Sequence, residues 1–114
     1  MTTHVNEIRL VGRLGASVVE RELPSGTVLT SFSVIIDRPA REIHGRTRVD
    51  TISCQTSRAA IATRLGKVEP GSVVEVQGAL RRRFWRAGTG LSSATEVDVA
   101  RLRMIKGGSL DAAG

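Results

Sequence analysis

The chain has 114 residues, of which 40% are hydrophobic and 25% charged, a composition that fits one globular domain. Its formal net charge is +6, and 15 of its 17 basic residues are arginine, which favours a polyanionic partner. A single cysteine, Cys54, excludes an internal disulfide bond and is too few for a zinc site. Neither a long apolar run nor a signal-peptide pattern is present, so we expect a cytoplasmic protein that does not enter a membrane.

Period-two alternation of apolar and polar residues predicts two strands in the first third of the chain, over residues 6–14 and 28–37. Gly12 lies inside the first strand, where a glycine often marks a bulge or a sharp bend. Residues 18–23 continue this strand. The second strand places Phe32 on its apolar face, so we expect this ring in the core.

The middle of the chain changes from a basic loop to a strand and then to a helix. Residues 38–48 contain four arginines, a proline and a glycine, which predicts the tip of a hairpin. Residues 49–56 alternate as a third strand, with Cys54 as a small buried hydrophobic residue. Over residues 57–65 the apolar spacing becomes four, which predicts a short helix with Ser57 as its N-cap.

The fourth strand, residues 71–86, begins apolar and ends in a basic, aromatic tip. Four of the six residues from 81 to 86 are arginine, and the other two are Phe84 and Trp85. Guanidinium groups bind phosphate and aromatic rings stack on bases. The tip is therefore typical of a surface that binds single-stranded nucleic acid, or else of core and interface rings at a strand edge that the arginines keep soluble.

Side-chain parity divides this tip into two faces. Leu80 and Phe84 share the parity of the apolar residues, so we expect both in the core. Trp85 shares the other parity with Arg81 and Arg83, which favours base stacking for Trp85 and phosphate contacts for the arginines. An oligomer contact or partial burial is the alternative for Trp85, because tryptophan is also enriched at protein interfaces.

A fifth strand over residues 93–105 follows a glycine turn, with Met104 facing inward and a bulge near Ala100. Five strands with one short helix between the third and the fourth predict an all-β, five-stranded OB-fold barrel. We expect this domain to span residues 1–106 and to be followed by a short disordered end over residues 107–114.

Several motifs follow one another in a fixed order along the chain. They are NEIRLVGRL at residues 6–14, TSFSV at 30–34, GSVVEVQGALR at 71–81, Trp85, and TEV at 95–97. Through these motifs the chain resembles the bacterial single-stranded DNA-binding protein family, from about Val5 to Ile105.

The resemblance implies a non-enzymatic subunit that binds single-stranded DNA in replication, repair or recombination and assembles with identical chains into a tetramer or dimer. We expect neither a metal nor a cofactor, because the acidic and histidine residues have no spacing that argues for a metal site or an acid–base pair. The expected nucleic-acid-binding residues are Trp85, Arg81, Arg83, Arg86, Arg38, Arg41, Arg46, Arg48 and Arg13.

Two features depart from the family pattern. The family stacks bases on further rings in stretches where this chain has Arg48, Ser53, Gln55 and Thr56. Because each stacked base contributes ~1–3 kcal/mol, we predict weaker and more salt-sensitive binding than in housekeeping members. The chain also ends in SLDAAG instead of an acidic, aromatic tip that recruits other proteins, so we expect no such recruitment.

Two other functions fit the same fold. One is a primosomal-type OB-fold accessory protein that acts mainly through helicase contacts, and the other is an OB-fold oligomerisation module with little DNA binding. An enzyme is not expected, because the chain shows no catalytic constellation of residues.

Overall fold

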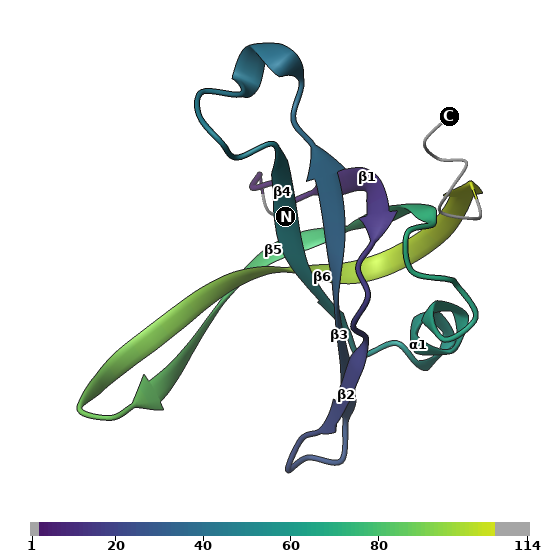
Figure 1. Cartoon of the computed structure of the whole chain (residues 1–114). Coiled ribbons are helices and arrows are strands. Elements are labelled where there is room, and N and C mark those ends of the chain that lie inside the picture. The colour runs from purple at the N-terminus through teal and green to yellow at the C-terminus, as the bar shows by residue number, and fades with distance from the viewer. Residues whose placement is uncertain (1–2, 107–114) are drawn as a thin grey trace.

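A closed ring of five strands forms the body of the protein, in the computed structural model, which describes residues 3–106 (Figure 1). The ring follows the order β1-β5-β6-β4-β3, and pairing between β1 and β3 closes it. These strands are β1 (Ile8–Leu14), β3 (Val28–Asp37), β4 (Val49–Thr56), β5 (Val73–Ala87) and β6 (Gly90–Lys106). The predicted OB-fold is confirmed, and the predicted end over residues 107–114 lies outside the described residues.

A sixth strand, β2 (Val19–Glu22), lies on the outer edge of β3. The sequence predicted this segment as a continuation of the first strand. In the structure it pairs antiparallel with β3 from Val19–Ser31 to Glu22–Val28, as a strand separate from β1. The difference leaves the five-stranded ring intact.

The strands of the ring and one helix enclose a single apolar core. Helix α1 (Ala59–Leu65) covers one end of it, and Phe32 and Cys54 are buried as predicted. The buried hydrophobic residues are Leu14, Phe32, Val34, Cys54, Ile61, Leu65, Val74, Val76, Val97, Val99 and Leu102.

Gly12 lies where β1 passes from β5 to β3. A Cβ atom at this position would lie 2.5 Å from the carbonyl oxygen of Ile35. The residues that follow Gly12, Arg13 and Leu14, pair with β3. The glycine is therefore needed because the barrel closes with backbone against backbone at this point.

The predicted helix cap was wrong. The helix begins at Ala59, and Ser57 is exposed and makes no capping hydrogen bond. The buried Thr56 hydroxyl accepts a hydrogen bond from the Arg58 amide (3.1 Å) and donates one to the Val99 carbonyl (3.0 Å). Thr56 therefore ties the start of the helix to β6 from inside the core.

Strands β5 and β6 continue past the barrel as a two-stranded arm, at the lower left of Figure 1. We call residues 80–96 the arm. The pairing of β5 with β1 ends at Gly78, and β4 pairs with β6 at Val97 and Asp98. Beyond these positions β5 and β6 pair with each other, down to the turn between Ala87 and Gly90.

Three residues predicted to face the core are exposed. Leu80 and Phe84 have the parity of Val74 and Val76, but the barrel layer that covers those valines ends before the arm begins. Met104 is exposed near the end of β6, beside a register shift at Val73/Val74. The predicted bulge at Ala100 is confirmed, because Arg101 pairs with Gln77 and Val99 pairs with Gly78. Within the described range, no helix is long and apolar enough to cross a membrane.

Candidate nucleic-acid interface

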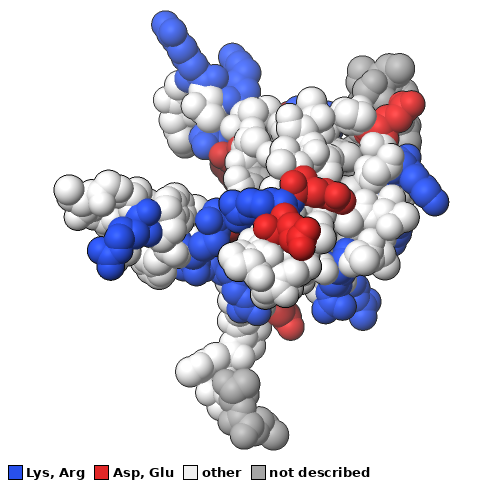
Figure 2. Space-filling model, turned by 90° about the horizontal axis from the view of Figure 1, so that it is seen from below, with Lys and Arg blue, Asp and Glu red and all other residues white. Residues whose placement is uncertain are grey.

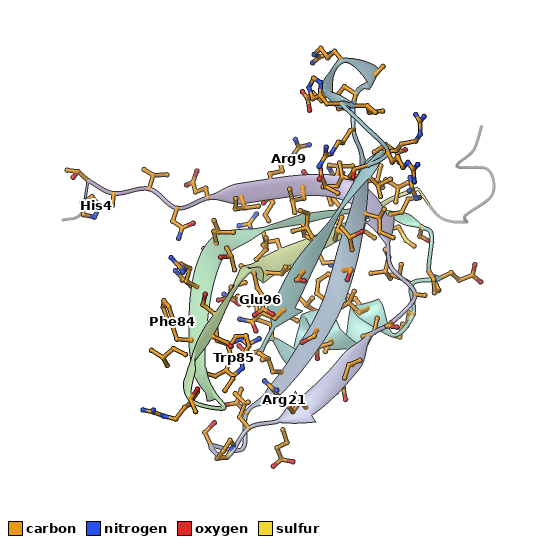
Figure 3. All side chains as sticks on the ribbon, turned by 60° about the vertical axis from the view of Figure 1, so that its left-hand side comes forward. His4, Arg9, Arg21, Phe84, Trp85 and Glu96 are labelled. Carbon is orange, nitrogen blue, oxygen red and sulfur yellow. The ribbon has the colours of Figure 1, made fainter. Side chains whose placement is uncertain are left out.

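The arm presents two differently built faces. Because neighbouring residues of a strand point to opposite sides, Arg81, Arg83 and Trp85 share one face, which we call the inner face. Arg82, Phe84 and Arg86 share the other, the outer face. Figure 3 shows the Phe84 and Trp85 rings on opposite sides of the hairpin, with Trp85 on the side of β2.

Trp85 is held on the inner face by an arginine and is 40% exposed. The guanidinium carbon of Arg83 lies 4.8 Å from the centre of the Trp85 ring, within cation–π range. Arg83 also donates two hydrogen bonds to the Glu96 carboxylate, from Nε to Oε1 (3.3 Å) and from Nη2 to Oε2 (3.4 Å). The indole is therefore positioned in advance of any ligand and keeps exposed surface for stacking.

The inner face carries balanced charge. Glu96 pairs with Arg83, and Asp98 lies 3.9 Å from the Nε of Arg81. Each of the two predicted phosphate ligands of this face therefore has a carboxylate beside it, which reduces its attraction for an anion. The sequence analysis missed these acids, although the short hairpin turn sets Glu96 opposite Arg81.

A small pocket joins the inner face to the barrel surface. It has a volume of about 210 Å³ and is lined by Glu96 of the arm, Val19 of β2, Ser31 and Ser33 of β3, and Ser53 of β4. Serine hydroxyl groups therefore line this part of the surface, and they offer hydrogen bonds to sugar, phosphate or base edges.

The polar residues that the sequence offered in place of the expected rings lie on β4 or just before it. Ser53 and Gln55 lie on the outward side of β4, opposite Ser33 and Ser31 of β3. Thr56 is buried and cannot contact a ligand, whereas Arg48 is exposed at the end of the loop. A bound strand would meet polar side chains along β4.

The loop over residues 38–48 rises from β3 and β4 at the top of Figure 1, away from the arm. It contains a 3₁₀ turn (Ala40–Glu42), and its ends are joined by a hydrogen bond from the Arg38 amide to the Arg48 carbonyl (2.9 Å). The pairing of β4 with β6 begins at Cys54, five residues along β4 from Val49, or about 16 Å. A polar stretch of β4 therefore links the loop to the base of the arm.

The predicted arginines near this loop fall into two groups. Arg38 binds Asp50 (Nη2 to Oδ1, 2.7 Å), a hydrogen bond that lowers the pKa of the Asp50 carboxyl. Arg13 of β1 donates from Nη1 to both Asp37 oxygens at 3.1 Å. The other group is exposed and has no ion pair within residues 3–106: Arg41, Arg46 and Arg48.

The outer face holds Arg86, which the sequence predicted as a nucleic-acid ligand, and three residues that it did not select: Arg82, Phe84 and Leu91. Phe84 is 60% exposed. Leu91 of β6, which pairs with Arg86, is 71% exposed. Arg82 lies over the Phe84 ring, and Arg86 follows two residues later on the same face. Seen from below, basic side chains mark the arm at the left of Figure 2, while acidic side chains lie over the body.

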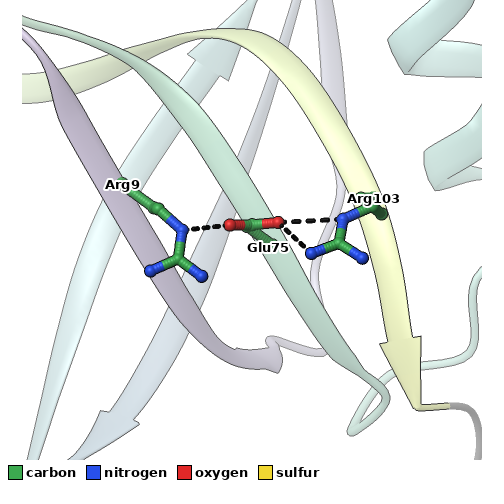
Figure 4. Close-up of polar contacts among 3 residues, drawn as sticks. All are labelled: Arg9, Glu75 and Arg103. Carbon is green, nitrogen blue, oxygen red and sulfur yellow. Dashed lines mark hydrogen bonds and ion pairs between the residues drawn. The ribbon is translucent and has the colours of Figure 1, made fainter.

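A separate charged cluster lies on the outward side of β1, β5 and β6. Glu75 accepts hydrogen bonds from Arg103 (Nε to Oε1, 2.9 Å) and from the Nε of Arg9 (Figure 4). The Arg103 and Arg9 hydrogen bonds lower the pKa of the Glu75 carboxyl. Arg9 of β1 and Arg103 of β6 both bind the almost buried carboxylate of Glu75 on β5, so this cluster joins the three strands and has a structural role. The described residues include no group of acidic, histidine or cysteine side chains suited to hold a metal.

Residues 5–105 match the family described as "Single-strand binding protein family". The chain belongs to this family. A "Single-stranded DNA-binding protein" of Oceanobacillus iheyensis is 29% identical over 79 residues, covering 69% of this chain and 49% of that relative. A "Single-stranded DNA-binding protein 3" of Listeria innocua is 27% identical over 86 residues, covering 75% and 54%. The chain spans about half the length of these curated relatives.

Solved structures share the family fold. The Plasmodium falciparum SSB in complex with ssDNA superposes with a TM-score of 0.76 at 22% identity, covering 93% of this chain and 99% of that one. The mitochondrial single-stranded DNA binding protein Rim1 of S. cerevisiae gives 0.70 at 14% identity, covering 93% and 100%. At these identities the likeness concerns the fold.

Proposed function

We propose that this chain is a non-enzymatic OB-fold subunit that binds single-stranded DNA. The observation that carries the proposal is the Trp85 ring, exposed on the inner face and held there by Arg83. Family membership supports the same function, because its relatives are named for binding single-stranded DNA.

In this proposal a base stacks on Trp85 and the strand continues over the hydroxyl-lined pocket and β4 toward the loop. Arg41, Arg46 and Arg48 then bind phosphates, because no carboxylate within residues 3–106 forms an ion pair with them. Arg13 and Arg38 contribute less, since Asp37 and Asp50 already pair with them. With few rings along this path, affinity depends on phosphate contacts and falls steeply with salt.

Substitution of Trp85 tests the proposal. We expect Trp85→Ala to weaken binding of fluorescein-labelled oligo-dT by about tenfold, within the range for one stacked base, whereas Trp85→Phe retains most of the affinity. In the unmodified protein, oligo-dT should quench the fluorescence of Trp85 as it binds. Unchanged affinity for Trp85→Ala would show that the ring is not a stacking site.

We also propose that identical chains associate, through the outward side of β1, β5 and β6. The support is the family resemblance together with Val11, an exposed apolar residue of β1 beside the Glu75 cluster. Light scattering coupled to size exclusion measures the assembly. A chain that assembles but shifts no oligo-dT at low salt would instead be an interaction module.

A role in replication, repair or recombination follows from the proposed ligand. Each of these processes exposes single strands that need protection.

A further inference from the structure

We propose that the outer face of the arm is a second binding surface for single-stranded DNA, with Phe84 as its stacking ring and Arg82 and Arg86 as its phosphate ligands. This inference rests on the proposed function, because it concerns the same ligand. It assigns a role to the face of β5 opposite Trp85.

The exposure of Phe84 is the first observation. The ring is 60% exposed on a ribbon that no other strand or helix of residues 3–106 covers, and it is more exposed than Trp85 at 40%. The Arg82 guanidinium carbon lies 5.1 Å from the centre of the Phe84 ring, the same kind of contact that Arg83 makes with Trp85. Each face of the arm therefore carries one aromatic ring supported by one arginine.

Charge distinguishes the outer face from the inner face. Arg82 makes a hydrogen bond from Nη2 to the Ser93 hydroxyl (3.4 Å), a neutral partner. Within residues 3–106, neither Arg82 nor Arg86 forms an ion pair, and the β6 residues paired on this face are Leu91, Ser93 and Thr95. The outer face thus carries two uncompensated positive charges, whereas Glu96 and Asp98 balance the inner face.

The spacing of these groups suits an extended strand of nucleic acid. Arg82 and Arg86 lie four residues apart on one strand, or about 13 Å, with Phe84 midway between them. A base stacked on Phe84 would therefore have a guanidinium group on either side for the neighbouring phosphates. On β6, Ser93 pairs with Phe84 and Thr95 pairs with Arg82, so their hydroxyl groups can donate hydrogen bonds to the sugar–phosphate backbone of the DNA.

The two rings lie on opposite sides of one two-stranded ribbon. DNA that stacks on both must therefore pass around the arm, or two segments of DNA must bind it, one on each side. Of the two faces of the arm, the outer face should contribute more of the salt-dependent attraction for DNA, because its arginines have no carboxylate partner within residues 3–106.

Three substitutions at one position separate stacking from apolar contact. We expect Phe84→Leu and Phe84→Ala to weaken binding of oligo-dT of about 16 nucleotides by about tenfold, whereas Phe84→Tyr retains the affinity. If Phe84→Leu binds like the unmodified protein, the ring does not stack and the inference fails. A loss of affinity that accompanies a change of assembly in light scattering would assign the face to a second copy of the chain, and would also overturn it.

The arginines give a second, independent measurement. The double substitution of Arg82 and Arg86 by glutamine should lower the slope of log affinity against log salt by about 1.4, at about 0.7 for each phosphate contact. The matched double substitution of Arg81 and Arg83 should change it less. An equal or larger effect of the inner pair would contradict the inference.

Quenching of Trp85 separates this inference from the proposed function. Phe84→Ala should leave the amplitude of quenching at saturation unchanged, because Trp85 lies on the other face. Binding of oligo-dT that is unaffected by every outer-face substitution would reject the second surface and leave the proposed function standing. Absence of oligo-dT binding by the unmodified protein at low salt would reject both.

Discussion

The side-chain amide of Asn6 pairs with the backbone of Leu80 through two hydrogen bonds of 2.8 Å each, one donated by Asn6 Nδ2 and one accepted by its Oδ1. The last backbone pair of β1 and β5 joins Ile8 to Gly78. The Asn6 side chain therefore adds one more pair of hydrogen bonds to β5 beyond the end of the β1–β5 ladder. This pair marks where the arm leaves the barrel.

Substitution of Asn6 should loosen the base of the arm. In Asn6→Ala the Leu80 amide loses its acceptor, and we expect its hydrogen exchange to accelerate roughly fivefold, which corresponds to ~1 kcal/mol. Asn6→Asp retains an acceptor and should leave the Leu80 amide protected. Equal exchange in all three proteins, measured by NMR, would mean that the pairing does not persist in solution.

Because of the Glu75 cluster, we expect the free energy of unfolding to fall at acidic pH. The Arg103 and Arg9 hydrogen bonds lower the pKa of Glu75 from its ordinary value of 4.5, so the folded state holds this carboxylate ionised. Its contribution to stability is full above pH 4.5 and is lost as the pH falls below that value. Glu75→Gln should be less stable than the unmodified protein at neutral pH, and the difference should shrink in acid.

Urea denaturation at neutral pH and below pH 4.5 measures this difference. Glu22→Gln, on the exposed strand β2, is the matched control for the removal of one carboxylate. A stability difference between Glu75→Gln and the unmodified protein that stays constant with pH would exclude the proposed linkage.

The loop arginines should differ in their effect on DNA binding. Arg46→Gln and Arg48→Gln should each lower the salt slope by about 0.7, if each binds one phosphate. Arg38→Gln should change it less, because Asp50 already binds this guanidinium at 2.7 Å. Titrations with oligo-dT at about 50 and 200 mM salt measure the slope, and an effect of Arg38→Gln as large as that of Arg48→Gln would refute the division into two groups.

Alternation within each strand was enough to predict most of the barrel. The bounds of β3 and β4 agree with the prediction, because their apolar residues alternate cleanly and a loop of different composition separates them. Alternation also revealed the bulge at Ala100, where an extra residue on β6 interrupts the pattern. Local sequence therefore carries the positions of these strands and of the bulge well.

Parity could not show how far the barrel covers a strand. Leu80 and Phe84 lie on the same side of β5 as the buried Val74 and Val76, but the layer over that side ends between them. That limit depends on where β1 and β4 stop pairing, which is a tertiary property. The ion pair of Arg83 with Glu96 likewise depends on the register of the β5–β6 hairpin, which only the position of its turn defines.

The buried thiol of Cys54 predicts a loss of stability in base. Burial, with a smaller effect of the Glu96 charge, raises the pKa of Cys54 from 9.0 to about 12. The unfolded chain releases this proton near pH 9.0 while the folded chain retains it, so stability falls as the pH rises from 9.0 toward 12. The loss approaches ~1.4 kcal/mol for each unit of pH.

Cys54→Val has no titrating group at this position and keeps a similar volume, so it should lack this part of the decline. At neutral pH we expect the two proteins to differ by less than about 1.5 kcal/mol, as for other substitutions that conserve volume. Urea denaturation at neutral pH and at a value between 9.0 and 12 makes the comparison. A parallel decline of the two proteins would show that Cys54 ionises in the folded state, and a thiol reagent would then modify it without unfolding.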